Sequence, residues 1–202
     1  VFDISSSNFG IIDLPDDSDQ IFQNVFDRYS HILTPSGDVI QILAQNEISD
    51  ESMLHVRGIL KSYLNNKSGS FWGDDKTNIS NAIASTNSLI FILNDPGMVD
   101  NIDFQSLINS GVSGDIIAAE EIIIEGDMNY INNSTLDKTY QKLFQFIFEY
   151  GIQYVMPSFL SSLDSAMVHA ISNEIYFPLS ELSFNQQRLR YASLGLEIYY
   201  GH

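Results

Sequence analysis

The spacing of apolar residues along the first third of the chain predicts a β-hairpin followed by a helix. Branched and aromatic residues run through 25–33 and resume through 38–44, and the Thr-Pro-Ser-Gly segment at 34–37 is typical of a turn between two strands. Over about 49–64, apolar residues recur three or four positions apart, which predicts an amphipathic helix. Ser49 is expected to cap this helix, because serine oxygens accept hydrogen bonds from the first N–H groups of a helix.

The middle of the chain predicts short elements in alternation. A second helix is expected over about 75–86, and it leads into a buried strand at 89–93. Asn-Asp-Pro-Gly then breaks the strand. A short helical turn follows at 104–108, and a further strand is expected at 116–124.

The last third of the chain predicts helices. The segment 134–137 has capping-box spacing, and apolar residues then recur at helical spacing over 136–150, with Gly151 as the expected C-terminal stop. In this helix, the expected core face is made of Tyr140, Leu143, Phe144 and Ile147. Two more helices are expected, around Leu160–Ala170 and around Leu189–Tyr199.

Strands early and helices late predict an α+β fold, with an N-terminal hairpin, a mixed sheet with packed helices and a helical C-terminal third. We expect a single domain over residues 21–202, preceded by an irregular arm over residues 1–20. The start Val1-Phe2-Asp3-Ile4 has neither a basic residue nor an apolar stretch, so it is not expected to be a signal peptide.

The charge balance narrows the range of partners. The chain has 26 acidic and 9 basic residues, a net charge of −17, and no basic residue between Lys76 and Lys138. Such a field repels phosphate backbones and anionic lipids, so we expect no nucleic acid as partner, and no apolar run is long enough for membrane insertion. A protein or carbohydrate partner is left open. The chain contains no cysteine, which excludes disulfides, thiolate metal sites and thiol nucleophiles.

The four histidines do not form a metal pair, because a two-histidine zinc helix needs them four residues apart. His55 and His169 are expected to be partly buried or at the surface. His31 is expected to be exposed on its hairpin strand. The segment Gly111–Gly114 lacks the spacing of a serine elbow and is interpreted as a loop.

Paired carboxylates are the remaining catalytic option, since two of them can flank a glycosidic bond. The candidates lie after the strand expected at 116–124 and on or beside the late helices: Glu120, Glu121, Glu125, Glu149, Glu174, Glu181 and Glu197. Surface acids are the default interpretation in so acidic a chain.

Several stretches resemble a group of mostly uncharacterised, secreted bacterial and marine proteins with a zincin-like metal helix. These are Phe26–Tyr29, Ser49–Glu51, Arg57–Leu64, Gly73–Thr77, Asn81–Ala84, Glu125-Gly126 through Thr139-Tyr140, Gly151–Pro157 and Leu196–Gly201. The resemblance implies a zincin-like layout and an extracellular or periplasmic location.

The resemblance also implies that the metal helix is degenerate in this chain. The two acids of the group's helix fall on Gln141 and Lys142, its histidine falls on Gln145, and its later glutamate falls on Glu197. A glutamine amide is a poor zinc ligand and cannot act as a general base. The calcium-type loop of more distant relatives is replaced by Asn65, Lys67 and Gly69, so no cofactor is expected, although calcium remains an option.

Two functions from different classes follow from these observations. The first is a non-catalytic, zincin-like secreted domain with a structural or binding role, a pseudoenzyme. The alternative is an active hydrolase, either metal-dependent and peptidase-like or carboxylate-based, whose catalytic acids the sequence does not place.

Overall fold

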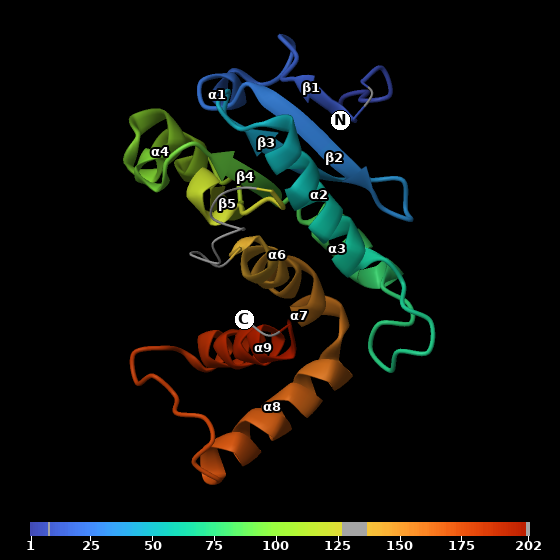
Figure 1. The fold of residues 1–202 in the computed structure, drawn as a ribbon, viewed down its shortest axis with the longest axis vertical. Helices are drawn as coiled ribbons and strands as arrows, with labels where there is room; N and C mark the ends of the chain where they lie inside the picture. The colour runs from blue at the N-terminus through green and yellow to red at the C-terminus, as the bar shows by residue number, and fades with distance from the viewer. Residues whose placement is uncertain (8, 127–136, 201–202) are drawn as a thin grey trace.

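A five-stranded mixed sheet forms the centre of the molecule (Figure 1). The computed structural model describes residues 1–7, 9–126 and 137–200. The strands are β1 (Ile11–Asp13), β2 (Arg28–Leu33), β3 (Val39–Ala44), β4 (Leu89–Leu93) and β5 (Gly114–Ala118). They lie in the order β1-β2-β3-β4-β5, the first three antiparallel and the last three parallel. This arrangement confirms the predicted α+β class, while the zincin-like layout stays a prediction.

Helices connect and cover these strands. They are α1 (Gln20–Gln23), α2 (Asp50–Leu64), α3 (Thr77–Ser85), α4 (Ile102–Asn109), α6 (Thr139–Ile147), α7 (Gln153–Val155), α8 (Pro157–Ser172) and α9 (Phe184–Tyr200). Two 3-10 turns, η1 (Pro96–Asp100) and η2 (Ala119–Glu121), and a π-helical turn, η3 (Phe148–Ile152), complete the described elements. None of the described helices has the length and apolar character needed to cross a bilayer.

The sheet separates two hydrophobic cores. Ile90 and Ile92 of β4 contact the larger core, which lies under α2, α3, α6 and η3. Phe91 packs on the other face with α4 and the N-terminal segment. Because β4 is buried on both faces, it needs the uninterrupted run Leu-Ile-Phe-Ile-Leu, which is typical of an inner parallel strand. Figure 1 shows α8 and α9 paired beyond the sheet, with α6 lying between them and the strands.

The predicted hairpin and first helix are confirmed. The N–H of Thr34 donates to Asp38 across the hairpin turn, where Gly37 has a φ of 90°. Ser49 accepts from the N–H of Ser52 at the start of α2, as a cap should. The helix at 75–86 and the strand at 89–93 are confirmed as well.

Several expectations need correction. Residues 11–13 of the expected irregular arm form β1, which pairs with β2. The strand expected at 116–124 is β5, which begins at Gly114 and gives way to η2 after Ala118. Gly151 does not end its helix but lies inside η3, where a Cβ would come within 2.7 Å of Ile79. The capping-box segment at 134–136 lies outside the described residues.

The expected core face of the helix over 136–150 is confirmed in part. Leu143 and Ile147 of α6 are buried, while Tyr140 and Phe144 are half-buried against the larger core. His31, expected to be exposed, is 8% exposed and belongs to the buried residues. Its burial follows from the N-terminal segment, which folds back beside β2 and covers it.

Candidate functional site

The residues implied by the family resemblance lie on α6 and α9. Gln141, Lys142 and Gln145 are half-buried on α6. Lys142 is 3.7 Å from Glu121, so its charge is neutralised within the molecule. No group of three or more potential metal-ligating residues occurs among residues 1–7, 9–126 and 137–200.

Glu197 belongs to α9, which packs against α6. The side chain of Glu197 lies outside the described part of the structure. Its convergence with Gln141 and Gln145 therefore stays a prediction.

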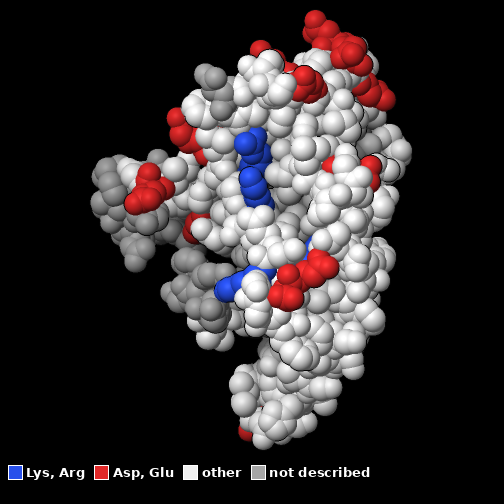
Figure 2. Space-filling model, turned by 90° about the vertical axis from the view of Figure 1, so that its right-hand side faces the viewer, with Lys and Arg blue, Asp and Glu red and all other residues white. Residues whose placement is uncertain are grey.

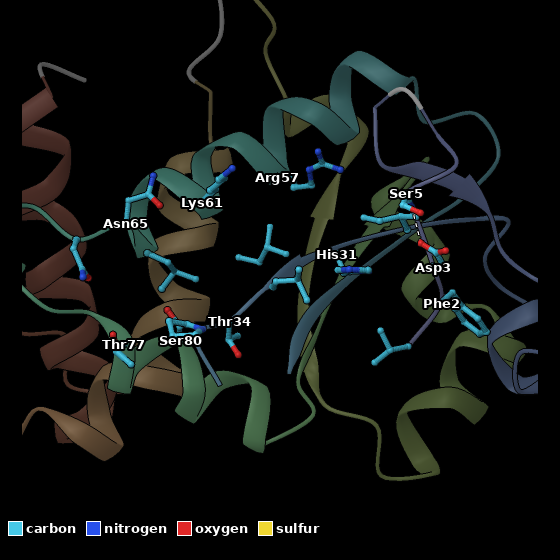
Figure 3. Close-up of a pocket in the computed structure, with 17 residues that line it drawn as sticks. Phe2, Asp3, Ser5, His31, Thr34, Arg57, Lys61, Asn65, Thr77 and Ser80 are labelled. Carbon is cyan, nitrogen blue, oxygen red and sulfur yellow. Dashed lines mark hydrogen bonds between the residues drawn. The ribbon is translucent and has the colours of Figure 1, made fainter. Parts of the chain in front are cut away.

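A cleft of about 850 Å³ opens between the N-terminal segment, the end of β2, α2 and the start of α3 (Figure 3). Arg57, His31 and Asp3 lie toward one end of the cleft, and Lys61, Asn65, Thr34, Thr77 and Ser80 lie toward the other (Figure 3). The lining includes Arg57, Lys61, His31, Asn65, Leu33 and Asp3. A concave site with apolar walls and a few convergent polar groups is typical of ligand-binding pockets.

Arg57 extends from α2 at the end of the cleft that also holds His31 and Asp3 (Figure 3). Its Nη1 donates to the carbonyl of Gly10 at 2.9 Å and to the hydroxyl of Ser30 at 3.0 Å. Gly10 has a φ of 65°, and a Cβ there would lie 2.5 Å from this nitrogen, so glycine is needed for the approach. Burial lowers the pKa of Arg57. These contacts hold the guanidinium in place without neutralising it.

Lys61 follows Arg57 after four residues on α2, and Asn65 caps the C-terminal end of this helix. Since α2 rises about 1.5 Å per residue, Arg57 and Lys61 are about 6 Å apart along the helix. All three side chains line the cleft. Among the described residues, no carboxylate lies within ion-pair distance of Arg57 or Lys61. One wall of the cleft therefore carries two uncompensated positive charges.

His31 lies on β2 between Arg57 and Asp3 in Figure 3. Its Nδ1 is buried and has no hydrogen-bond partner in the described structure. Burial lowers the pKa of His31, the charge of Arg57 lowers it further, and Asp3 opposes both. The imidazole is consequently held neutral at neutral pH, with an unsatisfied nitrogen in a buried position. Such orphaned polar atoms are uncommon in folded proteins and call for an explanation.

The unpaired cations of the cleft contrast with other bases of the chain. Arg28 pairs with Asp50, Arg188 pairs with Asp164, and both Lys138 and Lys142 lie 3.7 Å from Glu121. Figure 2 shows basic side chains gathered in the middle of one face of the molecule, with acidic side chains around them. Lys67, Lys76 and Arg190 also form no ion pair among the described residues, but they do not line the cleft, so Arg57 and Lys61 stand out because they lie together in one hollow.

A second group of titratable residues lies where β5 meets η3. Burial raises the pKa of Asp115 to about 6, with a further contribution from Glu149. Burial also raises the pKa of Glu149, and it raises that of Tyr150 to about 12. Asp115 and Glu149 are close enough to interact electrostatically, and only Glu149 was among the candidates for the predicted carboxylate pair. They do not line the cleft.

His55 forms the closest histidine–carboxylate contact in the described chain. It donates from Nε2 to Asp137 at 2.6 Å, beside a groove of about 360 Å³ that also contains Tyr140. Burial alone would raise the pKa of Asp137, but hydrogen bonds from His55 and Thr139 outweigh it and lower the pKa. The pair joins α2 to the start of α6, which gives it a structural role.

Comparison with models of protein families, with curated proteins and with solved structures found no match. The assignment of a site therefore rests on the geometry alone.

Sequence reasoning missed the cleft because its parts are far apart in the chain. Arg57 and Lys61 share a helical face that the sequence displays, and this spacing was the available signal. It was used only as part of the family resemblance. The fold-back of residues 1–5 onto β2, which completes the cleft and buries His31, has no local signature in the sequence.

Proposed function

We propose that this chain is a binding domain whose cleft takes up an anionic organic ligand. The observation that carries the proposal is the half-buried guanidinium of Arg57, seated by neutral groups and facing a cleft without a carboxylate partner. An isolated charge removed from water is costly, so a folded protein usually pairs it. An anion from outside would complete the site.

Two further features support this proposal. Lys61 adds a second cation one helical turn away, and His31, whose pKa is lowered by burial and by Arg57, lines the same cleft. A carboxylate suits this arrangement, because guanidinium groups bind carboxylates through charge-assisted hydrogen bonds. Charge focused in a concave site also raises the local concentration of a counter-charged ligand.

The lining of the cleft indicates that the ligand has an apolar portion. Ile4, Ile32, Leu33 and Leu64 contribute aliphatic surface to this lining. A purely inorganic anion would leave this surface in contact with water. An organic anion buries it and gains hydrophobic free energy in addition to the ionic contacts.

The proposal gives the predicted binding role a place on the molecule. The alternative of a hydrolase stays a prediction, as do the zincin-like family and the secreted location. Asp115 and Glu149 have raised pKa values, as a general acid needs, but they line neither the cleft nor the groove beside His55.

Isothermal titration with glutarate, at constant ionic strength, tests the proposal. We expect saturable binding that Lys61→Gln weakens by about tenfold, the effect of losing about 1.4 kcal/mol of a charge-assisted contact. Lys61 is exposed, so this change should leave the fold intact. Lys67→Gln is the matched control, because Lys67 is exposed, lies outside the cleft and carries the same charge.

Equal weakening in both variants would mean that only the overall charge matters, and the cleft would lose its assignment. Absence of binding to glutarate and to longer dicarboxylates, in a protein that remains folded, would reject the proposal.

A further inference from the structure

The outer edge of β2 is open beside the cleft. β1 pairs only with Arg28, Tyr29 and Ser30, whereas β2 continues to Leu33. Figure 1 shows β2 running on toward the hairpin turn beyond the end of β1. No described strand pairs with this last part of β2 on the side away from β3.

The register of the hairpin fixes which backbone groups face that edge. Thr34 donates to Asp38, so this pair is hydrogen-bonded across the hairpin. Hydrogen-bonded and non-hydrogen-bonded pairs alternate along an antiparallel ladder, so Leu33 and His31 belong to the non-bonded pairs with Val39 and Gln41. The N–H and C=O of Leu33 and the C=O of His31 therefore point outward. Gly10 precedes β1 and is the residue opposite His31, but its N–H donates to the carbonyl of Ser7 and not to the C=O of His31.

The open edge and the cations of α2 flank the same space. Arg28 contacts Asp50 at the start of α2, Ser30 contacts Arg57, and Leu64 faces the end of β2 across the cleft. The helix thus runs alongside β2 and in the same direction. Its row of Arg57 and Lys61 lies parallel to the unpaired strand edge.

We propose that the ligand of the cleft is an extended acidic peptide segment, which adds to the open edge of β2 at His31–Leu33 and places alternate carboxylates against Arg57 and Lys61. This inference rests on the proposed anion-binding function and names its ligand class. Addition of a strand to a free sheet edge is a general mode of peptide recognition, in which backbone pairing gives affinity and alternate side chains give specificity.

The spacings agree with this mode of binding. Alternate residues of a strand point to the same face and are about 6.8 Å apart. Arg57 and Lys61 are about 6 Å apart along α2. Carboxylates at positions i and i+2 of a strand can therefore meet the two cations in turn. The intervening side chains face the exposed Leu33 and the N-terminal segment, so apolar residues suit those positions.

The test uses an eight-residue peptide of alternating glutamate and valine with blocked ends, titrated into the full chain. We expect it to bind at least about tenfold more tightly than glutarate, because the backbone pairs add hydrogen bonds of about 1 kcal/mol each. N-methylation of the amides on the pairing edge should abolish that gain without changing the charge. An alternating lysine and valine peptide should not bind.

Two variants of Leu33 place the contact on the strand. Leu33→Pro removes an outward N–H but no bond of the hairpin ladder, since proline is tolerated on edge strands when its nitrogen faces away from the sheet. Compared with Leu33→Ala, it should weaken the peptide about tenfold, whereas glutarate should bind equally to the two variants. Leu33→Ala keeps the N–H and serves as control for the lost side chain. A circular dichroism spectrum shows whether each variant keeps the fold.

The outcomes separate the two proposals. If glutarate binds, and the N-methylated peptide binds as well as the parent, the anion-binding function stands and the strand addition is wrong. If neither glutarate nor the peptide binds, both proposals fail. If sedimentation shows a dimer that the peptide does not dissociate, the edge is occupied by a second copy of the chain, and the peptide assignment is overturned.

Discussion

The cleft beside β2 and the contact of β5 with η3 both bury titratable groups, but they treat charge in opposite ways. In the cleft, Arg57 and Lys61 form no ion pair with a carboxylate of the described residues. At the contact, Lys142 shares Glu121 with Lys138, and the buried groups are acids. A charge that the fold leaves uncompensated at an open site points to a partner from outside. A charge neutralised within the fold serves the structure.

The same contrast predicts opposite responses to acid. Asp115 is held in an environment that favours its protonated form, and His31 is held in one that favours its neutral form. Lowering the pH therefore stabilises the contact of β5 with η3, where Asp115 becomes protonated, and destabilises the cleft, where His31 becomes charged.

Gly114 at the start of β5 should be the most sensitive position of the closed contact. A Cβ there would lie 2.0 Å from the carbonyl oxygen of Leu89, a backbone atom that cannot move without breaking the pairing of β4 and β5. Gly114→Ala should therefore lower the free energy of unfolding by about 3 kcal/mol or more. Urea denaturation followed by circular dichroism measures it.

Gly58 on α2 is the matched control for this substitution. Gly58 lies in the middle of α2 and is exposed to solvent, and nothing lies within 4 Å of a Cβ built on it. Gly58→Ala should stabilise the protein by about 0.5 to 1 kcal/mol, because alanine loses less backbone entropy in a helix. A loss at Gly114 no larger than the change at Gly58 would show that β5 does not pack against β4 as described.

Asp115→Asn should stabilise the protein near pH 7.5 by about 2 to 3 kcal/mol, since a shift of about two pKa units corresponds to this free energy. The folded-state pKa is raised to about 6 from 3.8. The stability of the wild type is therefore full below pH 4 and falls as the pH rises through about 6. Asparagine has no charge to bury and removes that fall.

The measurement is the free energy of unfolding of both proteins at several pH values between 4 and 7.5. Their difference isolates Asp115 from the other acids, although Glu149 contributes in the same direction. A difference that does not grow as the pH rises would mean that the carboxyl of Asp115 is well solvated, and the closed character of this contact would be lost.

The hydrophobic pattern predicted much of the fold, because burial on one face or on both leaves a periodicity in the sequence. The hairpin, α2 and the fully buried β4 all follow from it. Gly151 was misread because glycine serves two purposes: it ends helices, and it lets them approach closely, as η3 approaches Ile79. The site was harder to predict, because it depends on long-range contacts such as that of Arg57 with Gly10, which leave no local spacing.

His31→Gln should have a smaller effect, of opposite pH dependence to that of Asp115→Asn. The folded-state pKa of His31 is lowered by burial and by Arg57, so the wild type keeps its full stability above the usual pKa of histidine and loses stability as the pH falls through that value. Glutamine cannot become charged, so the variant should lose less stability between pH 7 and pH 5. Thermal unfolding at these two pH values measures the difference, and an equal loss in both proteins would place His31 in contact with water.

The smallest effects should come from substitution of Lys142, near the contact of β5 with η3, and of Lys61, in the cleft. Lys142→Gln removes an ion pair with Glu121 and one favourable charge near Asp115, so it should cost about 0.5 to 1 kcal/mol at low salt and less at high salt. Lys61→Gln removes no pair and relieves repulsion from Arg57, so its change in unfolding free energy should stay within about 0.5 kcal/mol. Denaturant melts of both variants at 20 mM and 500 mM sodium chloride, chosen to span weak and strong screening at about 20 and 4 Å, test this ordering. If Lys61→Gln proves the costlier of the two, then Lys61 has a partner inside the fold, and the cleft does not need an anion to complete it.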